Sequence, residues 1–172
     1  MKFYTSSVRI DMVMEMKTIK TNAIRQLDKA KLNYEIYTYE CDGFLEGTEV
    51  AKITNQNPDH VFKTLVCISP TKNYYVFLIP VACELDLKKC AKTVHEKHIE
   101  LIHVNDLLKT TGYVRGGCSP IGMKKCFPTY IHESCLNLEK IIFSGGKLGI
   151  QIAMMPNDLI ELIHAQTADL IA

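Results

Sequence analysis

Lys63 is the residue whose surroundings most clearly suggest chemistry. It stands in the segment Val61-Phe62-Lys63-Thr64-Leu65-Val66, where apolar residues surround its charge. A charge in a stretch that otherwise looks buried is costly unless it meets a partner. Such a lysine can hold a phosphate or stabilise a developing oxyanion. The pattern equally allows a lysine at a strand edge, whose stem packs while its ammonium reaches water.

Two glycine-rich segments could add backbone donors to the same pocket. The first runs from Gly112 to Gly122 and contains Gly116-Gly117-Cys118-Ser119, and the second is Phe143-Ser144-Gly145-Gly146-Lys147. Paired glycines permit positive φ angles and let a ligand approach backbone N–H groups. Neither segment matches the phosphate-loop or dinucleotide-binding patterns, so we expect no nucleotide-triphosphate site. Ordinary turns are the alternative. With Lys63, the two loops predict a pocket for a small anion, a carbonyl or a phosphate.

Other reactive residue types form weaker patterns. Ser119 and Ser144 have no nearby histidine and lie in no G-x-S-x-G turn, so a catalytic triad is not expected. The histidines lack zinc-ligand spacing, and we expect no metal. The seven cysteines include no C-x-x-C pair and are read as reduced thiols in a cytoplasmic protein. Cys118 could be a reactive thiol, but a small residue filling the loop is the simpler interpretation.

Length and composition favour one soluble domain. Of the 172 residues, 47% are hydrophobic and 23% are charged, which is enough apolar material for a core. The net charge of +1 argues against binding nucleic acid mainly by electrostatics, but it allows contact with one RNA end. No apolar stretch is long enough to span a bilayer. We expect residues 1–16 to be an extension or leader and residues 17–172 to form the domain.

The helices and strands that must position these residues follow one another along the chain without a strict βαβ repeat. Apolar spacing predicts helices over 18–31, 48–53 and 86–94, a short helix capped by Asn105, and a last helix opened by Pro156. It predicts strands over 34–39, 64–68, 75–79, 129–132, 140–143 and 149–154. The fold class expected is therefore mixed α+β, with a central, mostly antiparallel sheet.

Five short motifs stand in a familiar order. They are Thr38-Tyr39-Glu40, Val61 to Leu65, Glu84 to Lys89, the Gly112 to Gly122 loop, and Ser144 to Lys147. From about Thr18 onward the chain resembles the YbaK/EbsC family of bacterial Cys-tRNA(Pro) deacylases, relatives of the editing domain inserted in prolyl-tRNA synthetase. The resemblance implies a mostly antiparallel sheet or partial barrel flanked by helices. It also implies hydrolysis of cysteine that has been wrongly attached to proline tRNA. Cysteine and proline are similar in volume, and an apolar pocket rejects a near-isostere poorly.

The resemblance also assigns roles. It implies that Lys63 is the required lysine, which binds the terminal adenosine phosphate or orients the ester. It implies that the substrate is bound by Tyr39, by Gly116, Gly117 and Ser119 of the first loop, and by Ser144, Gly145 and Gly146 of the second. No metal or cofactor is implied. The implied mechanism lets the substrate's own thiol attack its ester, so a lyase classification is also conceivable, and Cys118 is not the nucleophile. The implied partners are the acceptor end of a mischarged tRNA and prolyl-tRNA synthetase, in the cytoplasm and away from membranes.

Two positions depart from the family pattern. Gln151 stands where relatives are expected to carry an aspartate, and Cys118 where they often carry an aliphatic residue. Both leave room for a deacylase that acts on another small amino acid, such as alanine. A non-catalytic module that binds a tRNA end or a synthetase surface is the alternative from another class.

Overall fold

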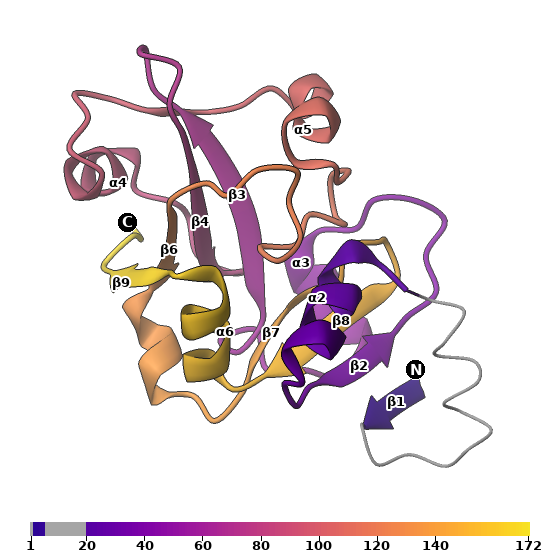
Figure 1. Ribbon diagram of the computed structural model, residues 1–172. Helices are drawn as coiled ribbons and strands as arrows, with labels where there is room; N and C mark the ends of the chain where they lie inside the picture. Colours follow the sequence, from indigo (N-terminus) through magenta and orange to yellow (C-terminus); the bar gives the residue numbers. More distant parts are fainter. Residues whose placement is uncertain (1, 6–19) are drawn as a thin grey trace.

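The computed structural model describes residues 2–5 and 20–172, and these form a mixed α+β domain (Figure 1). The strands are β1 (Lys2–Thr5), β2 (Glu35–Thr38), β3 (Phe62–Ile68), β4 (Tyr74–Pro80), β5 (Glu100–Leu101), β6 (Thr129–His132), β7 (Ile141–Ser144), β8 (Ile150–Met154) and β9 (Gln166–Ala168). The helices are α2 (Asn22–Ala30), α3 (Gly47–Ile53), α4 (Leu87–Thr93), α5 (Val104–Thr111) and α6 (Pro156–Ile163), with a 3-10 turn η1 (Glu133–Asn137). The predicted fold class is confirmed.

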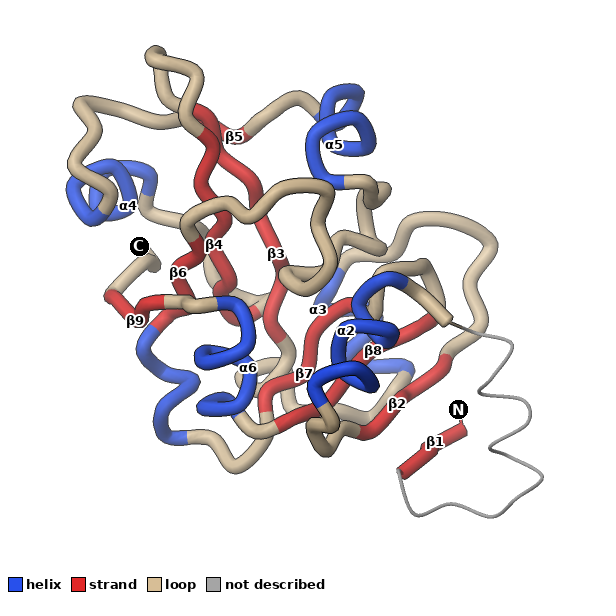
Figure 2. Tube along the Cα trace, viewed as in Figure 1, coloured by secondary structure: helices blue, strands red, loops and turns tan. Residues whose placement is uncertain are grey.

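The strands form two sheets that meet along one edge. One sheet has the order β1-β2-β8-β7 and is antiparallel throughout. The other has the order β5-β3-β4-β6-β9, in which β4–β6 and β6–β9 are parallel. A single parallel bridge, Val61 to Ile142, joins the start of β3 to β7. The described strands therefore make an open, curved pair of sheets and do not close into a barrel (Figure 2).

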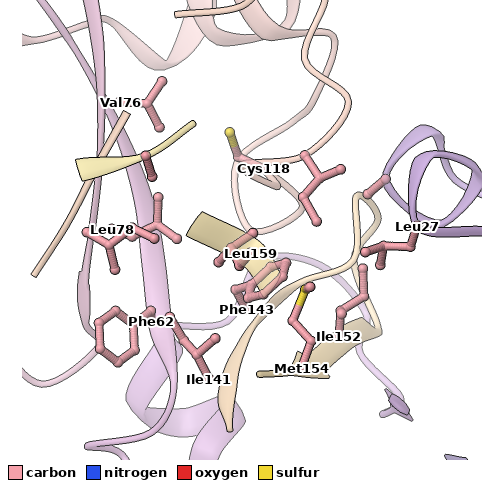
Figure 3. Close-up of a cluster of buried hydrophobic side chains, with 14 of the residues drawn as sticks. Leu27, Phe62, Val76, Leu78, Cys118, Ile141, Phe143, Ile152, Met154 and Leu159 are labelled. Carbon is pink, nitrogen blue, oxygen red and sulfur yellow. The ribbon is translucent and has the colours of Figure 1, made fainter. Parts of the chain in front are cut away.

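Helices cover both faces of the four-stranded sheet. Ala23, Ile24 and Leu27 of α2 pack with Ile152 of β8 on one face. Ala51 of α3 belongs to a separate cluster on the opposite face (Figure 1). The larger cluster continues to Phe143 and Leu159, which are completely buried (Figure 3). Burial of each such side chain contributes about 1.5–3 kcal/mol, so β7 and β8 are firmly held on this side.

The helix ends explain where α2 and α5 begin. Thr21 caps α2, because its Oγ1 accepts a hydrogen bond from the Ile24 backbone N at 3.2 Å. The prediction that Asn105 caps the next-to-last helix is wrong, because His103 occupies the N-cap and α5 already begins at Val104. Asn105 instead lies in the first turn.

The six predicted strands are confirmed to within two residues at each end, whereas β5 and β9 were not predicted. These strands have two and three residues, which is too short for a period of two to show. At the N-terminus, β1 pairs with β2 and places Phe3 opposite Tyr37. The remainder of the predicted 1–16 extension lies outside the described residues, so that boundary stays a prediction. None of the described helices combines the length and the apolar character that a bilayer crossing requires.

Candidate functional site

A cavity of about 490 Å³ lies where the two sheets separate. β3 is bridged to β7 only at Val61 and pairs with β5 only from Cys67 onward, so the edge between these points has no neighbouring strand. The cavity occupies this gap. Residues of β3, α3, α5, the first glycine loop and the ends of β7 and β8 line it.

The open edge of β3 presents backbone groups to the cavity. Val81 N donates to Val61 O at 2.8 Å on the β4 side, and Ile102 N donates to Val66 O at 3.0 Å on the β5 side. Hydrogen-bonding directions alternate along a strand, so Thr64 directs its N–H and C=O to the same side as Val66. No strand pairs with Thr64 on that side, and its buried Oγ1 has no partner among the described residues. The edge can therefore bind a polar ligand.

The strand register brings Lys63 and Ser144 to the two sides of this gap. Lys63 follows Val61 by two residues, and Ser144 follows Ile142 by two, so the bridge places both side chains on one face. Both line the cavity.

The same row continues across the other sheet. Gln151 of β8 lies opposite Ser144 of β7 on one side and opposite Tyr37 of β2 on the other. Tyr39 follows on the same face as Tyr37, and its backbone N donates to Gly149 O at 3.0 Å. Gln151 and Tyr39 also line the cavity, so one row of polar side chains runs along its floor.

Lys63 provides a positive charge without an internal counterion. Its side chain is partly buried, and within residues 20–172 its ammonium makes no ion pair or hydrogen bond. An ammonium with unused donors at a cavity wall is suited to bind an oxyanion, a phosphate or a polarised carbonyl.

The other members of the row supply neutral polar groups. Ser144 Oγ accepts a hydrogen bond from Gly146 N at 3.3 Å, which leaves the hydroxyl proton to be donated. Burial raises the pKa of Tyr39, so its phenol stays protonated and can donate at neutral pH. Gln151 is only 5% exposed, and its Oε1 has no hydrogen-bond partner among the described residues.

The two glycine loops pack against each other at the side of the cavity. Gly116 lines the cavity with φ +82°, and a Cβ there would come within 2.6 Å of Leu148 Cδ2. A Cβ on Gly117 would lie 3.2 Å from the backbone of Lys147 and Leu148. Both positions therefore need glycine for close loop packing.

Three further predicted site residues lie behind the cavity wall. Ser119 is fully buried, and its Oγ accepts from Ile121 N at 3.3 Å. Gly145 O accepts from Thr21 Oγ1 at 2.6 Å, and Gly146 lies against the Thr21 side chain. The structure thus gathers Tyr39, Lys63, Gly116 and Ser144 around the cavity, whereas Gly117, Ser119, Gly145 and Gly146 shape the loops. Direct contact of the latter group with substrate stays a prediction.

Two lining residues at the mouth were not predicted. The Arg115 guanidinium lies 4.0 Å from the ring centroid of Phe44 and 3.6 Å from Glu46 Oε1. Phe44 is 40% exposed, and a planar cation over an exposed ring is a surface on which a base or another ring can stack. The available sequence signal was an aromatic residue directly after the Asp42-Gly43 turn.

Cys118 lines the cavity as a neutral thiol. Burial raises its pKa to about 12, well above neutral pH. The raised pKa agrees with the interpretation that this thiol is not a nucleophile. Among residues 2–5 and 20–172, no three His, Cys, Asp or Glu side chains gather in a way that could hold a metal ion.

Comparisons with known proteins identify the family. Residues 46–162 match the model of the aminoacyl-tRNA editing domain. The chain is 42% identical to EbsC of Enterococcus faecalis, a candidate Cys-tRNA(Pro)/Cys-tRNA(Cys) deacylase, over 88% of this chain and 93% of that protein.

Two solved structures share the fold. The hypothetical protein APE2540 superposes with a TM-score of 0.81 at 18% identity, covering 88% of this chain and 100% of that one. A candidate trans-editing enzyme for prolyl-tRNA synthetase gives a TM-score of 0.74 at 21% identity, covering 96% and 99%. At these identities the likeness shows the fold alone, whereas the family rests on the matched domain and on EbsC. The chain belongs to the aminoacyl-tRNA editing domain family.

Proposed function

We propose that this protein is a trans-editing deacylase that hydrolyses the ester of Cys-tRNA(Pro). The observation that carries the proposal is Lys63, an ammonium that has no counterion among the described residues and lines a cavity whose floor offers further unused polar groups. An aminoacyl ester joined to a terminal adenosine presents a carbonyl and a nearby phosphate, which such a site can bind. The 42% identity to EbsC supports the same substrate.

In the proposed reaction, the protein positions the ester and stabilises its charge. The Lys63 ammonium binds the adenosine phosphate or the ester carbonyl oxygen, and the Thr64 edge and Ser144 hydroxyl offer further donors. The cysteinyl thiol attacks the ester carbonyl. The carbon–sulfur bond forms, the bond to the ribose oxygen breaks, and the thiol proton ends on the released ribose hydroxyl. Water then opens the cyclic thioester to give cysteine.

The proposed partners follow from charge. A net charge of +1 provides little long-range attraction to RNA, so we propose that prolyl-tRNA synthetase presents the acceptor end. The free cysteines within the described residues fit a reducing compartment, which supports the cytoplasm as the place of action.

The test is a deacylation panel measured under single-turnover conditions. The substrates are Cys-tRNA(Pro), Ala-tRNA(Pro), Pro-tRNA(Pro) and Cys-tRNA(Cys), with and without the synthetase. We expect fastest release from Cys-tRNA(Pro), with Pro-tRNA(Pro) spared. Fastest release of alanine would instead identify a deacylase for another small amino acid. Binding without release from any member would leave a non-catalytic tRNA-binding module and contradict the proposal.

The matched variants are Lys63→Met and Lys29→Met. Both remove one ammonium, but Lys29 is exposed on α2 and does not line the cavity. We expect only Lys63→Met to abolish fast release.

A further inference from the structure

Gln151 is a buried side chain whose hydrogen-bonding capacity is unused. It is the second residue of β8, is 5% exposed, and lines the cavity. Its Oε1 is buried and has no hydrogen-bond partner within the described residues. A buried acceptor without a partner costs about 1–3 kcal/mol relative to a satisfied one. Such a group in a cavity wall points to a ligand.

The two hydroxyls on either side of Gln151 each make a hydrogen bond to another group. The Tyr37 hydroxyl donates to Glu35 Oε2 at 2.8 Å. Ser144 Oγ accepts from Gly146 N at 3.3 Å. The register places the carboxamide between these two side chains, and Ser144 keeps its hydroxyl proton for donation.

The other polar side chains along the cavity floor indicate which group of the ligand Gln151 binds. Lys63, Ser144 and Tyr39 can all donate hydrogen bonds to the ester or the phosphate, whereas Gln151 adds a neutral acceptor. The aminoacyl end of the substrate carries an α-ammonium, which has three N–H donors and needs acceptors in the cavity.

We propose that Gln151 Oε1 accepts a hydrogen bond from the α-ammonium of the bound aminoacyl group. The two ends of the carboxamide exchange by rotation about χ3, so the ammonium group can draw the oxygen toward the cavity. A neutral acceptor recognises the amine without adding a carboxylate that would compete for Lys63. The inference rests on the proposed function, since it assigns a subsite for the same substrate.

The experiment uses binding, so that it does not depend on turnover. One probe is 3′-amino-3′-deoxyadenosine acylated on its 3′ nitrogen with L-cysteine, and the second is the matching 3-mercaptopropionyl amide, which lacks the α-amine. Calorimetry with the full chain gives both dissociation constants. We expect the wild type to prefer the amine-bearing probe by about tenfold or more, which corresponds to a charged hydrogen bond of at least about 1.4 kcal/mol.

Two variants assign that preference to the side chain. Gln151→Met keeps the length but removes the polar atoms, and should bring the two dissociation constants within about twofold. Gln151→Glu keeps an acceptor and should retain the preference. Urea unfolding of each variant confirms that it is folded.

Each outcome bears on the inference separately from the proposed function. An unchanged preference in Gln151→Met, or an equal loss on both probes, would overturn the inference, as would binding of neither probe at millimolar concentration. Probe binding with the expected preference, together with failure to release cysteine from any tRNA, would support the subsite and contradict the deacylase.

Discussion

Replacement of Lys63 by methionine tests whether the charge of this side chain is needed for activity or for folding. The side chain leaves β3 beside the open strand edge, and within the described residues its ammonium has no counterion or hydrogen-bond acceptor. Methionine keeps most of the aliphatic stem and its packing. The substitution therefore removes a charge that the folded protein itself does not use.

We expect the substitution to lower the rate of deacylation strongly and to change the stability of the fold little. A hydrogen bond to a charged group contributes about 1.5–3 kcal/mol, so losing it in the transition state should lower kcat/KM by about 10- to 150-fold. No ion pair within the described residues is broken, so the free energy of unfolding should change by less than about 0.5 kcal/mol. Lys63→Arg should restore part of the rate, because it retains the charge but presents it as a planar fork.

The assays are single-turnover release of radiolabelled cysteine and urea unfolding, both on the same preparations. A stable protein with a large rate loss is the expected result. An unchanged rate, or a loss of more than about 1.5 kcal/mol in unfolding free energy, would show that Lys63 is structural and would refute the reasoning.

Three other perturbations test separate parts of the structure. Gly116→Ala should slow cysteine release and lower the urea midpoint, because position 116 has a φ of +82° and its added Cβ would lie 2.6 Å from Leu148 Cδ2, so that a refolded variant with an unchanged rate and midpoint would contradict the role of this loop. Burial alone would raise the pKa of Glu35, but hydrogen bonds from Lys140 and Tyr37 and the charge of Lys140 lower it. The folded-state pKa thus lies below the unfolded value of about 4.3, so the pair stabilises the protein above that pH and this contribution is lost as the pH falls through the folded value. Lys140→Met should therefore lower the urea midpoint at pH 7 but not near pH 2, and equal shifts at both would contradict the assignment. Finally, burial raises the pKa of Cys118 to about 12, so mass spectrometry should find it far slower to react with maleimide at pH 7.5 than an exposed cysteine.

Local sequence patterns were sufficient for most secondary structure. The apolar spacing of α2 reflects one buried face, which periodicity detects directly, whereas β4 and β8 are buried on both faces and are indicated by short continuous runs of mostly apolar residues. β5 and β9 form by pairing with the longer strands β3 and β6. Their own residues therefore contain no pattern that predicts a strand.

The site depended on register, which no local pattern encodes. The bridge from Val61 to Ile142 connects segments that are far apart in the chain and brings Lys63 beside Ser144. The apolar neighbours of Lys63 indicated that residue, and the resemblance to a family gave Tyr39 and Ser144 their roles. The unpartnered atoms of Thr64 and Gln151 became visible only with burial and hydrogen bonds known. The mutual packing of the glycine loops likewise depends on tertiary contacts of Gly117.

The central claim is that the cavity around Lys63 releases cysteine from proline tRNA. Its most direct test is the rate of cysteine release from Cys-tRNA(Pro) by the wild type and by Lys63→Met, with Pro-tRNA(Pro) measured in parallel. We expect release that is fast, depends on Lys63 and leaves the prolyl ester intact. Release that is equally fast in the variant, or no release by the wild type with synthetase present, would contradict it.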